Sequence, residues 1–263
     1  MKNPNNAQTV RHVLLPAVIL MAIMGTAQAA PIYGTITVGG SAEVTQTTID
    51  YDPIIAGDPL NGTGDLGALA PGTGVFSTLG FLDPGTIVDR SVTAGVVPAQ
   101  PAGVPILVMN WLTFTNPAFR YALDLTFIDI GSYSSLDCGA PEAVSQTCTP
   151  SAPAPFQSPY NLSNFNDSTA GLSSNANFSV RGVMRNLDTG LIDYNFNGVF
   201  GAEFLGQSYQ DVLAAVSVPG GSVVASYSGT INATSAAVPE PSTGLLAGIG
   251  AGLLGLSILR RKK

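Results

Sequence analysis

The sequence predicts an all-β fold, an antiparallel β-sandwich of jelly-roll type, with an N-terminal signal helix before it and a C-terminal transmembrane helix after it. Apolar and polar residues alternate with a period of two in several segments, which is typical of strands with one buried face. The 263 residues include 30 glycines and 19 prolines, which favours many short turns over long helices. Strands with a single apolar face need a second sheet to cover them, and a sandwich supplies it.

The N-terminal residues 1–29 have the pattern of a secretory signal peptide. Lys2 and Arg11 precede an apolar run over residues 13–24, and Ala27-Gln28-Ala29 places small residues where a signal peptidase reads them. We expect cleavage directly after this tripeptide. The alternative is an uncleaved anchor, but the apolar run is shorter than a membrane span needs.

The body, residues 30–237, is predicted to form one β-sandwich domain. Alternation is clearest in three segments, and four others are less regular strand candidates. One short helix is expected from Ser208 to Val216, where apolar residues recur at helical spacing. The regular strand segments are 121–127, 178–185 and 192–204, and the less regular ones are 32–38, 75–82, 106–115 and 223–233.

Cys138 and Cys148 are the only two cysteines of the chain. A signal peptide directs the chain to an oxidising compartment, where a disulfide between them is the default. Closing this loop of 11 residues should contribute about 2.8 kcal/mol on the chain-entropy model. The alternative is a redox or metal role, which the spacing disfavours because it is not Cys-x-x-Cys.

The distribution of charged side chains excludes several classes of function. The single histidine, His12, lies in the signal peptide, and residues 30–259 contain neither histidine nor lysine. Ser-His-Asp and Cys-His catalysis, histidine metal ligation and lysine Schiff bases therefore lack their side chains in the body. Only four arginines accompany the seventeen acidic residues between Glu43 and Glu240, so the surface repels nucleic acid. We expect no nucleic-acid partner, no cofactor and no metal.

The C-terminal segment, residues 238–263, has three parts. Pro239, Glu240 and Pro241 come first, and the sixteen residues 244–259 that follow shortly after carry no charge. A helix of that length is about 24 Å long and can span a thin or locally thinned bilayer. A basic cluster ends the chain and predicts a cytoplasmic tail by the positive-inside rule. Its residues are Arg260, Arg261, Lys262 and Lys263.

These three parts, in this order, resemble the PEP-CTERM sorting signal of Gram-negative bacteria that make extracellular polysaccharide. The resemblance implies that an exosortase, a multi-pass membrane protease of transpeptidase type, recognises Pro239, Glu240 and Pro241. It implies cleavage nearby and delivery of the body from the inner membrane to the cell surface or extracellular matrix. The alternative is a plain single-span anchor after a Pro-rich linker. Residues 138–160 and 204–213 also resemble the bodies of uncharacterised exported PEP-CTERM proteins.

Three short motifs imitate functional sites in the body. Gly62-Thr-Gly64-Asp-Leu-Gly67 matches the dinucleotide pattern, but no strand precedes it and Pro71 ends any following helix. Asp188-Thr189-Gly190 is the aspartic-protease triplet, yet it occurs once and lies between two alternating segments, where it predicts a hairpin turn. Residues 193–204 begin like a calcium loop, but the twelfth position is Phe204 rather than an acid.

Three functions remain for the body. The leading hypothesis is an exported structural or adhesive protein without catalysis. The second is a carbohydrate-binding module for exopolysaccharide, which exposed coplanar aromatic rings would indicate, although Trp111 is expected in the core. The third is a hydrolase with two carboxylates facing each other across a cleft. The candidate glutamates of this hydrolase are Glu43, Glu142 and Glu203.

A calcium site outside the EF-hand class is a separate alternative. It would use acids among Asp50, Asp52, Asp58 and Asp65.

Overall fold

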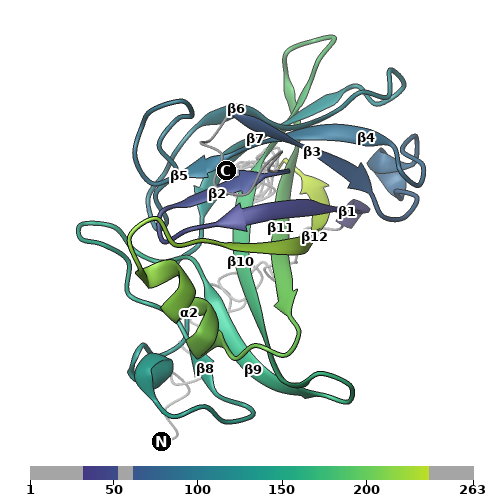
Figure 1. Cartoon of the computed structure of the whole chain (residues 1–263). Helices are drawn as coiled ribbons and strands as arrows, with labels where there is room; N and C mark the ends of the chain where they lie inside the picture. The colour runs from purple at the N-terminus through teal and green to yellow at the C-terminus, as the bar shows by residue number, and fades with distance from the viewer. Residues whose placement is uncertain (1–31, 53–61, 237–263) are drawn as a thin grey trace, which may run out of the picture. The chain divides into compact units, whose positions relative to one another are not determined.

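The computed structural model describes residues 32–52 and 62–236, which belong to one unit of the chain (Figure 1). The predicted signal peptide, residues 1–29, and the predicted transmembrane helix, residues 244–259, lie outside the described residues. So do the Pro-Glu-Pro element and the basic cluster of residues 260–263. Within the described part, no helix has both the length and the apolar character that crossing a membrane requires.

The described residues form twelve strands, one α-helix and two short 3-10 helices. The first six strands are β1 (Ile32–Val44), β2 (Thr48–Tyr51), β3 (Thr63–Ala68), β4 (Pro84–Val88), β5 (Arg90–Ser91) and β6 (Val108–Phe114). The other six are β7 (Tyr121–Ile128), β8 (Thr147–Cys148), β9 (Asn161–Asp167), β10 (Gly171–Asn186), β11 (Ile192–Phe204) and β12 (Val223–Ser235). The helices are η1 (Gly74–Phe76), η2 (Leu136–Gly139) and α2 (Tyr209–Ser217).

Eight strands form a closed ring, in the order β11, β12, β1, β3, β4, β6, β7 and β10, with β10 pairing back onto β11. Every pairing in the ring is antiparallel. The predicted all-β, antiparallel class is therefore confirmed. The predicted jelly-roll sandwich is not confirmed. The strand pairing gives a single sheet that closes on itself instead of two sheets that face each other. Closure pairs the edges that an open sheet would leave exposed.

The long strand β10 explains both the closure and an extension of the sheet. Residues 180–186 of β10 pair with β7 inside the ring, while residues 171–177 pair with β9 beyond it. Its other edge pairs with β11 over nearly the whole length. Strand β8 adds to β9, and β2 joins β1 to β5 outside the ring. Figure 1 shows β10 running from the ring down to β9 and α2.

Most predicted elements are present, with one clear error. The segments 121–127, 178–185 and 192–204 lie in β7, β10 and β11, and the predicted helix corresponds to α2. The predicted strand 75–82 is wrong, because this segment forms η1 and turns. Its buried residues Phe76 and Leu79 are spaced by three, which suits a helical turn rather than a strand.

An aromatic core fills the closed ring. Trp111 is only 2% exposed, as predicted. Its ring stacks on Phe196, with centroids 6.0 Å apart and planes within 5°, and meets the ring of Phe200 edge-on at 5.5 Å. These rings come from β6 and β11, so they pack side chains from different parts of the ring against one another. Buried aromatic pairs of this kind contribute beyond their area.

Candidate functional site

A cavity of about 400 Å³ lies between α2 and the strands β9, β10 and β11, and we call it the α2 cavity. Its walls are mostly apolar. Arg90 from β5 is its charged residue, and Tyr160, which directly precedes β9, lies beside it. The other polar residues of the lining are Thr45, Gln46, Ser151, Gln157, Ser158 and Ser217. Apolar side chains around it include Val92, Leu162, Phe178, Phe204, Val212 and Leu213.

Helix α2 is fixed in place over this cavity by its own N-terminus. Ser208 caps the helix, accepting from the backbone N–H of Asp211 at 3.1 Å, while the Asp211 carboxylate accepts from the Ser208 N–H at 3.1 Å. This capping box satisfies two backbone donors that a helix start would otherwise leave unpaired. The backbone N–H of Tyr209 donates to the buried side chain of Asn164 on β9 at 2.8 Å. The helix is therefore tied to the sheet as well as capped.

Arg90 is the charged group of the α2 cavity. It is 2% exposed, and its Nη1 donates to the Tyr160 hydroxyl at 3.3 Å. Its guanidinium carbon lies 5.7 Å from the centroid of the same Tyr160 ring, within cation–π range. Among residues 32–52 and 62–236, its Nε and Nη2 atoms have no hydrogen-bond partner. Burying a charge with so few partners is costly.

The backbone beside Arg90 is held by a buried polar network. The Asp89 carboxylate accepts from the backbone N–H of Tyr51 at 3.0 Å and of Gly62 at 2.9 Å. Gln100 donates through Nε2 to the Asp89 carbonyl at 2.7 Å. Burial raises the pKa of Asp89 despite these two backbone donors, and burial likewise raises the pKa of Tyr51. The network thus fixes the position of strand β5, which carries Arg90.

A second hollow, of about 640 Å³, lies beside the β1–β2 hairpin, and we call it the hairpin pocket. Glu43 and Asp50 both line it and are directly opposite each other in the register of β1 and β2. They are 4% and 5% exposed. Ser222 donates its hydroxyl to the Glu43 carboxylate. Directly opposed residues have Cβ atoms about 4.5–5.5 Å apart, so the register brings two buried carboxylates together.

The hairpin pocket and the α2 cavity are neighbours. Both are lined by Thr45, Gln46, Val216 and Ser217. The hairpin pocket adds the hydroxyl groups of further threonines in the turn, whereas the walls of the α2 cavity are mainly apolar. One region of the fold therefore carries an acidic, hydroxyl-rich hollow and a basic, apolar one.

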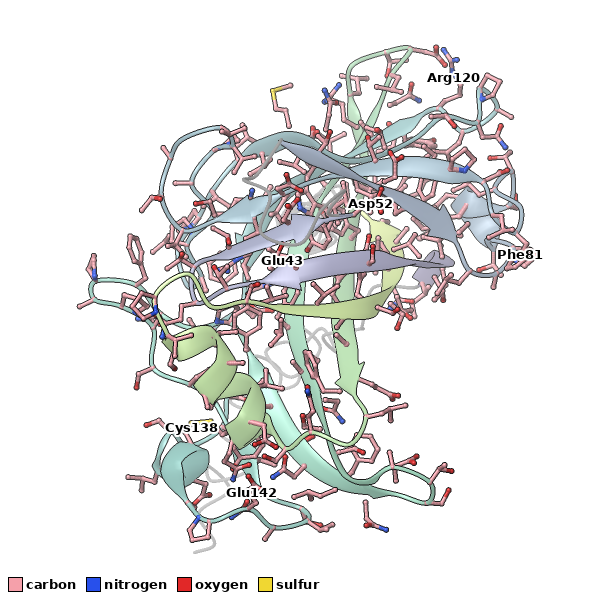
Figure 2. The ribbon with its side chains drawn as sticks, in the orientation of Figure 1. Glu43, Asp52, Phe81, Arg120, Cys138 and Glu142 are labelled. Atoms are coloured by element: carbon pink, nitrogen blue, oxygen red, sulfur yellow. A yellow bond between two sulfur atoms is a disulfide. The ribbon has the colours of Figure 1, made fainter. Side chains whose placement is uncertain are left out.

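The remaining predicted acids are dispersed. Glu142 and Glu203 are exposed, and Figure 2 shows Glu142 beyond α2, far from Glu43. Asp52 and Asp65 are exposed, and Asp58 lies outside the described residues. No group of three or more acidic, cysteine or histidine side chains that could hold a metal occurs in the described part of the chain.

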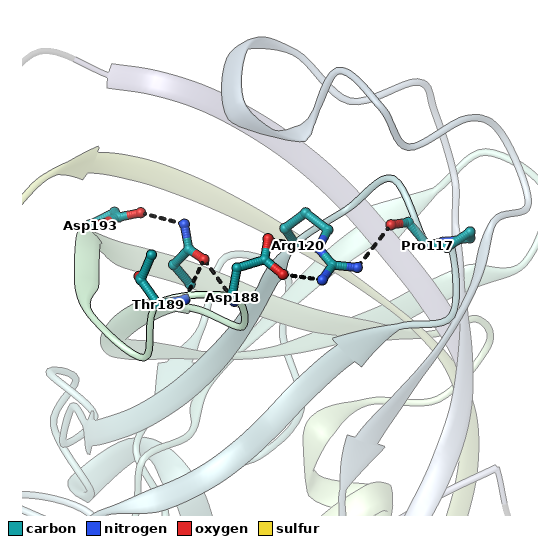
Figure 3. A network of polar contacts seen from close by, with 6 residues as sticks. Pro117, Arg120, Asp188, Thr189 and Asp193 are labelled. Carbon is teal, nitrogen blue, oxygen red and sulfur yellow. Dashed lines mark hydrogen bonds and ion pairs between the residues drawn. The ribbon is translucent and has the colours of Figure 1, made fainter.

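Asp188 lies in the turn that joins β10 to β11, as predicted for its triplet (Figure 3). Gly190 has a φ of 73°, in the left-handed region that favours glycine. The Asn186 side chain accepts from the backbone N–H groups of Asp188 at 2.9 Å and Thr189 at 3.3 Å. Arg120 forms an ion pair with Asp188 through two nitrogens. The triplet therefore builds a tethered turn.

The two other motifs are strands in the structure, which the alternation of residues 193–204 predicted and the glycine motif did not. Residues 63–68 form β3, which pairs with β4 and β1, so the glycine pattern does not open a helix. Residues 193–204 lie within β11, which pairs along both edges with β10 and β12. Neither segment has the loop geometry that a dinucleotide or an EF-hand calcium ion requires.

The predicted disulfide between Cys138 and Cys148 is present, with Cα atoms 5.1 Å apart. It joins η2 to β8, and Cys148 is fully buried with Leu162 and Tyr209 in a small second core. The Tyr209 hydroxyl donates to the Asp137 carbonyl at 2.9 Å. Cys138 also lines the α2 cavity, and Figure 2 shows it beside the helix. The disulfide therefore braces one wall of the cavity.

The described residues show no coplanar aromatic platform on one face. Tyr33, Phe81 and Tyr133 are exposed aromatics. Tyr33 packs against Tyr194 with an interplanar angle of 48°, and Tyr194 meets the next ring of the cluster, Tyr121, at 74°. These tilted rings pack on each other rather than presenting one flat surface.

Comparison with known proteins identifies the C-terminal segment. Residues 237–263 match the family model of the PEP-CTERM protein-sorting motif. The match includes Pro239, Glu240 and Pro241 and the basic end of the chain. No curated protein and no solved structure matches the chain significantly. The predicted resemblance is confirmed, and the chain carries the signal of an exported protein targeted to an exosortase.

Proposed function

We propose that this is a cell-surface or extracellular-matrix protein of a Gram-negative bacterium, with a structural or adhesive role and no catalytic activity or cofactor. Residues 1–29 direct export, and an exosortase acts at Pro239, Glu240 and Pro241. Until then residues 244–259 and the basic cluster of residues 260–263 hold the chain in the inner membrane. The observation that carries the proposal is the PEP-CTERM match at residues 237–263.

The described body supports this role. Its strands pair into a closed ring, and a disulfide ties η2 to β8, which suits an oxidising compartment outside the cytoplasm. Residues 30–259 contain neither histidine nor lysine. The closed ring and the disulfide suit a durable exported domain.

The sorting step is tested by replacing Pro239, Glu240 and Pro241 with alanine and following the protein's size and location in its own host. We expect the variant to remain full-length in the inner membrane. The matched control replaces Pro141 and Glu142, an exposed Pro-Glu pair of the body, and should be released normally. Normal release of the first variant would overturn the proposal.

The hairpin pocket favours carbohydrate binding as a second candidate function. Three threonines, Thr45, Thr47 and Thr48, line this hollow together with the carboxylates of Glu43 and Asp50, so its wall is polar in the way that a sugar-binding surface requires. Part of this wall is already hydrogen-bonded within the protein, since Thr45 bonds Thr48 at 2.7 Å and Ser222 donates to Glu43. The same two carboxylates are the pair that a two-carboxylate hydrolase would use.

One experiment separates these two activities from each other and from a purely structural role. The protein is incubated with the exopolysaccharide of its host, and both retention on the polymer and polymer length are measured. Retention that is lost in Asp50→Asn, without shortening of the polymer, supports binding. Shortening of the polymer that is lost in Glu43→Gln and in Asp50→Asn supports hydrolysis. If the unaltered protein neither stays on the polymer nor shortens it, the purely structural role is supported.

A further inference from the structure

The residues that line the α2 cavity include a buried, mainly apolar set and an exposed, polar set. The buried apolar side chains come from the strands and from α2, whereas the exposed polar ones come from the connecting segments and the last residue of α2. An exposed lining residue lies near the mouth of a cavity, and a buried one lies deeper. The buried apolar residues include Leu162, Phe178, Phe204 and Val212, and the exposed polar ones are Gln46, Ser151, Gln157 and Ser217.

The polar side chains deeper in the α2 cavity are already engaged within the protein or turned away from it. The Thr45 hydroxyl is hydrogen-bonded to that of Thr48 at 2.7 Å, and the Ser158 hydroxyl accepts from the backbone N–H of Tyr160 at 3.3 Å. Arg90 donates from Nη1 to the Tyr160 hydroxyl, and its Nε and Nη2 atoms each expose less than 1 Å². The deep part of the cavity therefore offers a ligand mainly apolar surface.

The mouth of the α2 cavity suits a polar head group without a charge. Gln46, Ser151 and Gln157 carry amide and hydroxyl groups, which both donate and accept hydrogen bonds. No acidic residue of the described chain lines this cavity, and Arg90, its charged lining residue, is only 2% exposed. A charged head group would lose hydration there without gaining an accessible opposite charge, which is costly. Hydroxyl groups on the ligand match these side chains better.

The α2 cavity is preformed and has the size of a small-molecule site. Its volume of about 400 Å³ falls in the usual range of such sites. The disulfide of Cys138 braces one wall, and α2 is held by its capping box and by Asn164. A site that is held in place loses little entropy when a ligand binds. An alkyl chain of a few carbons would gain free energy with each methylene group that it buries there.

We propose that the α2 cavity binds a small uncharged amphiphile, a molecule with a short alkyl chain and a hydroxyl-bearing head group. The alkyl chain lies among Leu162, Phe178 and Val212, and the head group lies at the mouth near Gln46 and Gln157. Alkyl glycosides and monoacylglycerols share this chemistry. The site does not depend on sorting by the exosortase, nor on polysaccharide binding in the hairpin pocket.

The test uses the full chain in lipid nanodiscs, titrated by calorimetry with hexyl glucoside and with 1-hexanoylglycerol, after subtraction of the heats from empty nanodiscs. Hexanoate supplies a similar chain with a charged head, and glucose supplies a head without a chain. We expect at least one of the two amphiphiles to bind about tenfold or more tightly than hexanoate and than glucose. The amphiphile that binds identifies the head group that the site accepts. Equal affinity for hexanoate or for glucose, or no binding of either amphiphile, would overturn the proposal.

Variants locate the ligand within the chain. Ala202→Leu adds bulk to the cavity wall and should weaken binding of the amphiphile about tenfold, because part of its chain no longer fits. The matched control is Ala214→Leu, the same change at an exposed position of α2, which should leave the affinity unchanged. Gln46→Ala together with Gln157→Ala should weaken binding about fivefold through lost hydrogen bonds to the head group. Unchanged affinity in Ala202→Leu would contradict the assignment.

A measurement on the unaltered protein keeps the proposal testable if a variant does not fold. The methyl resonances of Leu162 and Leu213, which line the cavity, should shift on titration with the amphiphile. Those of Leu187, which is exposed in the β10–β11 turn, should not. Cavity resonances that stay in place while the amphiphile binds would place the ligand elsewhere and overturn the proposal.

Discussion

Arg185 binds Asp124 through two nitrogens at once, with Nε at 2.8 Å from one carboxylate oxygen and Nη2 at 3.1 Å from the other. Asp124 is 3% exposed and also accepts from the backbone N–H of Asn110 at 2.7 Å. The three residues lie on β10, β7 and β6, three successive strands of the closed ring. One buried carboxylate therefore fastens three strands together.

Replacing Asp124 with asparagine should lower the free energy of unfolding by about 3 kcal/mol, because Arg185 and the Asn110 N–H lose a charged acceptor in a buried place. Denaturant unfolding measures the change. The control is Asp129→Asn, which removes the more exposed partner of Arg181 and should cost less than about 1 kcal/mol. Similar losses in the two variants would contradict the role given to burial.

Removing the disulfide by Cys138→Ser together with Cys148→Ser should lower the free energy of unfolding by about 2.8 kcal/mol, through the larger entropy of the unfolded chain. Chemical unfolding of the two forms under non-reducing conditions measures it. Reduction of the unaltered protein should reproduce the loss, while the double variant should not respond to reductant. A stability that is insensitive to both changes would show that the bond does not constrain this segment.

Acid should weaken the tether between Arg120 and the β10–β11 turn. The hydrogen bond and the charge of Arg120 lower the pKa of Asp188 below its usual value. A lowered folded-state pKa gives a contribution that is present above the unfolded pKa and is lost as pH falls through the folded one. The stability advantage over Asp188→Asn should therefore shrink below about pH 4. Thermal unfolding from about pH 5 to about pH 2 tests this, and Arg120→Gln should abolish the difference.

The inner face of the ring leaves no room for a side chain at Gly182. A Cβ atom there would lie 2.2 Å from the Asp124 carbonyl oxygen and 2.4 Å from two ring atoms of Phe196. Gly182→Ala should therefore destabilise the protein by about 1–3 kcal/mol through overpacking. Gly95→Ala is the control, since no heavy atom lies within 4 Å of its Cβ position, and its effect should stay within about 0.5 kcal/mol. Unfolding midpoints that fall equally would contradict the packing described here.

Local signals in the sequence predicted the elements that stand on their own chemistry. Period-two alternation identified β7, β10 and β11 because each has one buried face, and apolar residues at helical spacing identified α2. Strand β3 was missed because its residues, Thr-Gly-Asp-Leu-Gly-Ala, are typical of a loop. In the structure Gly64 allows a close approach to Tyr51, where a Cβ atom would lie 1.8 Å from the carbonyl oxygen.

The closed ring and the candidate sites depend on long-range pairing that no local pattern encodes. The closure needs β10 to pair with β7 on one edge and with β11 on the other, while a different part of β10 pairs with β9 beyond the ring. Glu43 and Asp50 were each considered from the sequence, but only the hairpin register places them opposite each other. Arg90 lies in a strand of two residues, too short for alternation to reveal. The sequence offered one signal for Arg90, namely that arginine is rare in the body and that Arg90 is one of only four.

The most direct test of sorting by an exosortase is the intact mass of the protein recovered from the cell surface or matrix of its host. We expect a chain that begins at Ala30 and ends close to Pro239, Glu240 and Pro241, without residues 244–263. A recovered chain that still ends at Lys263 would contradict it.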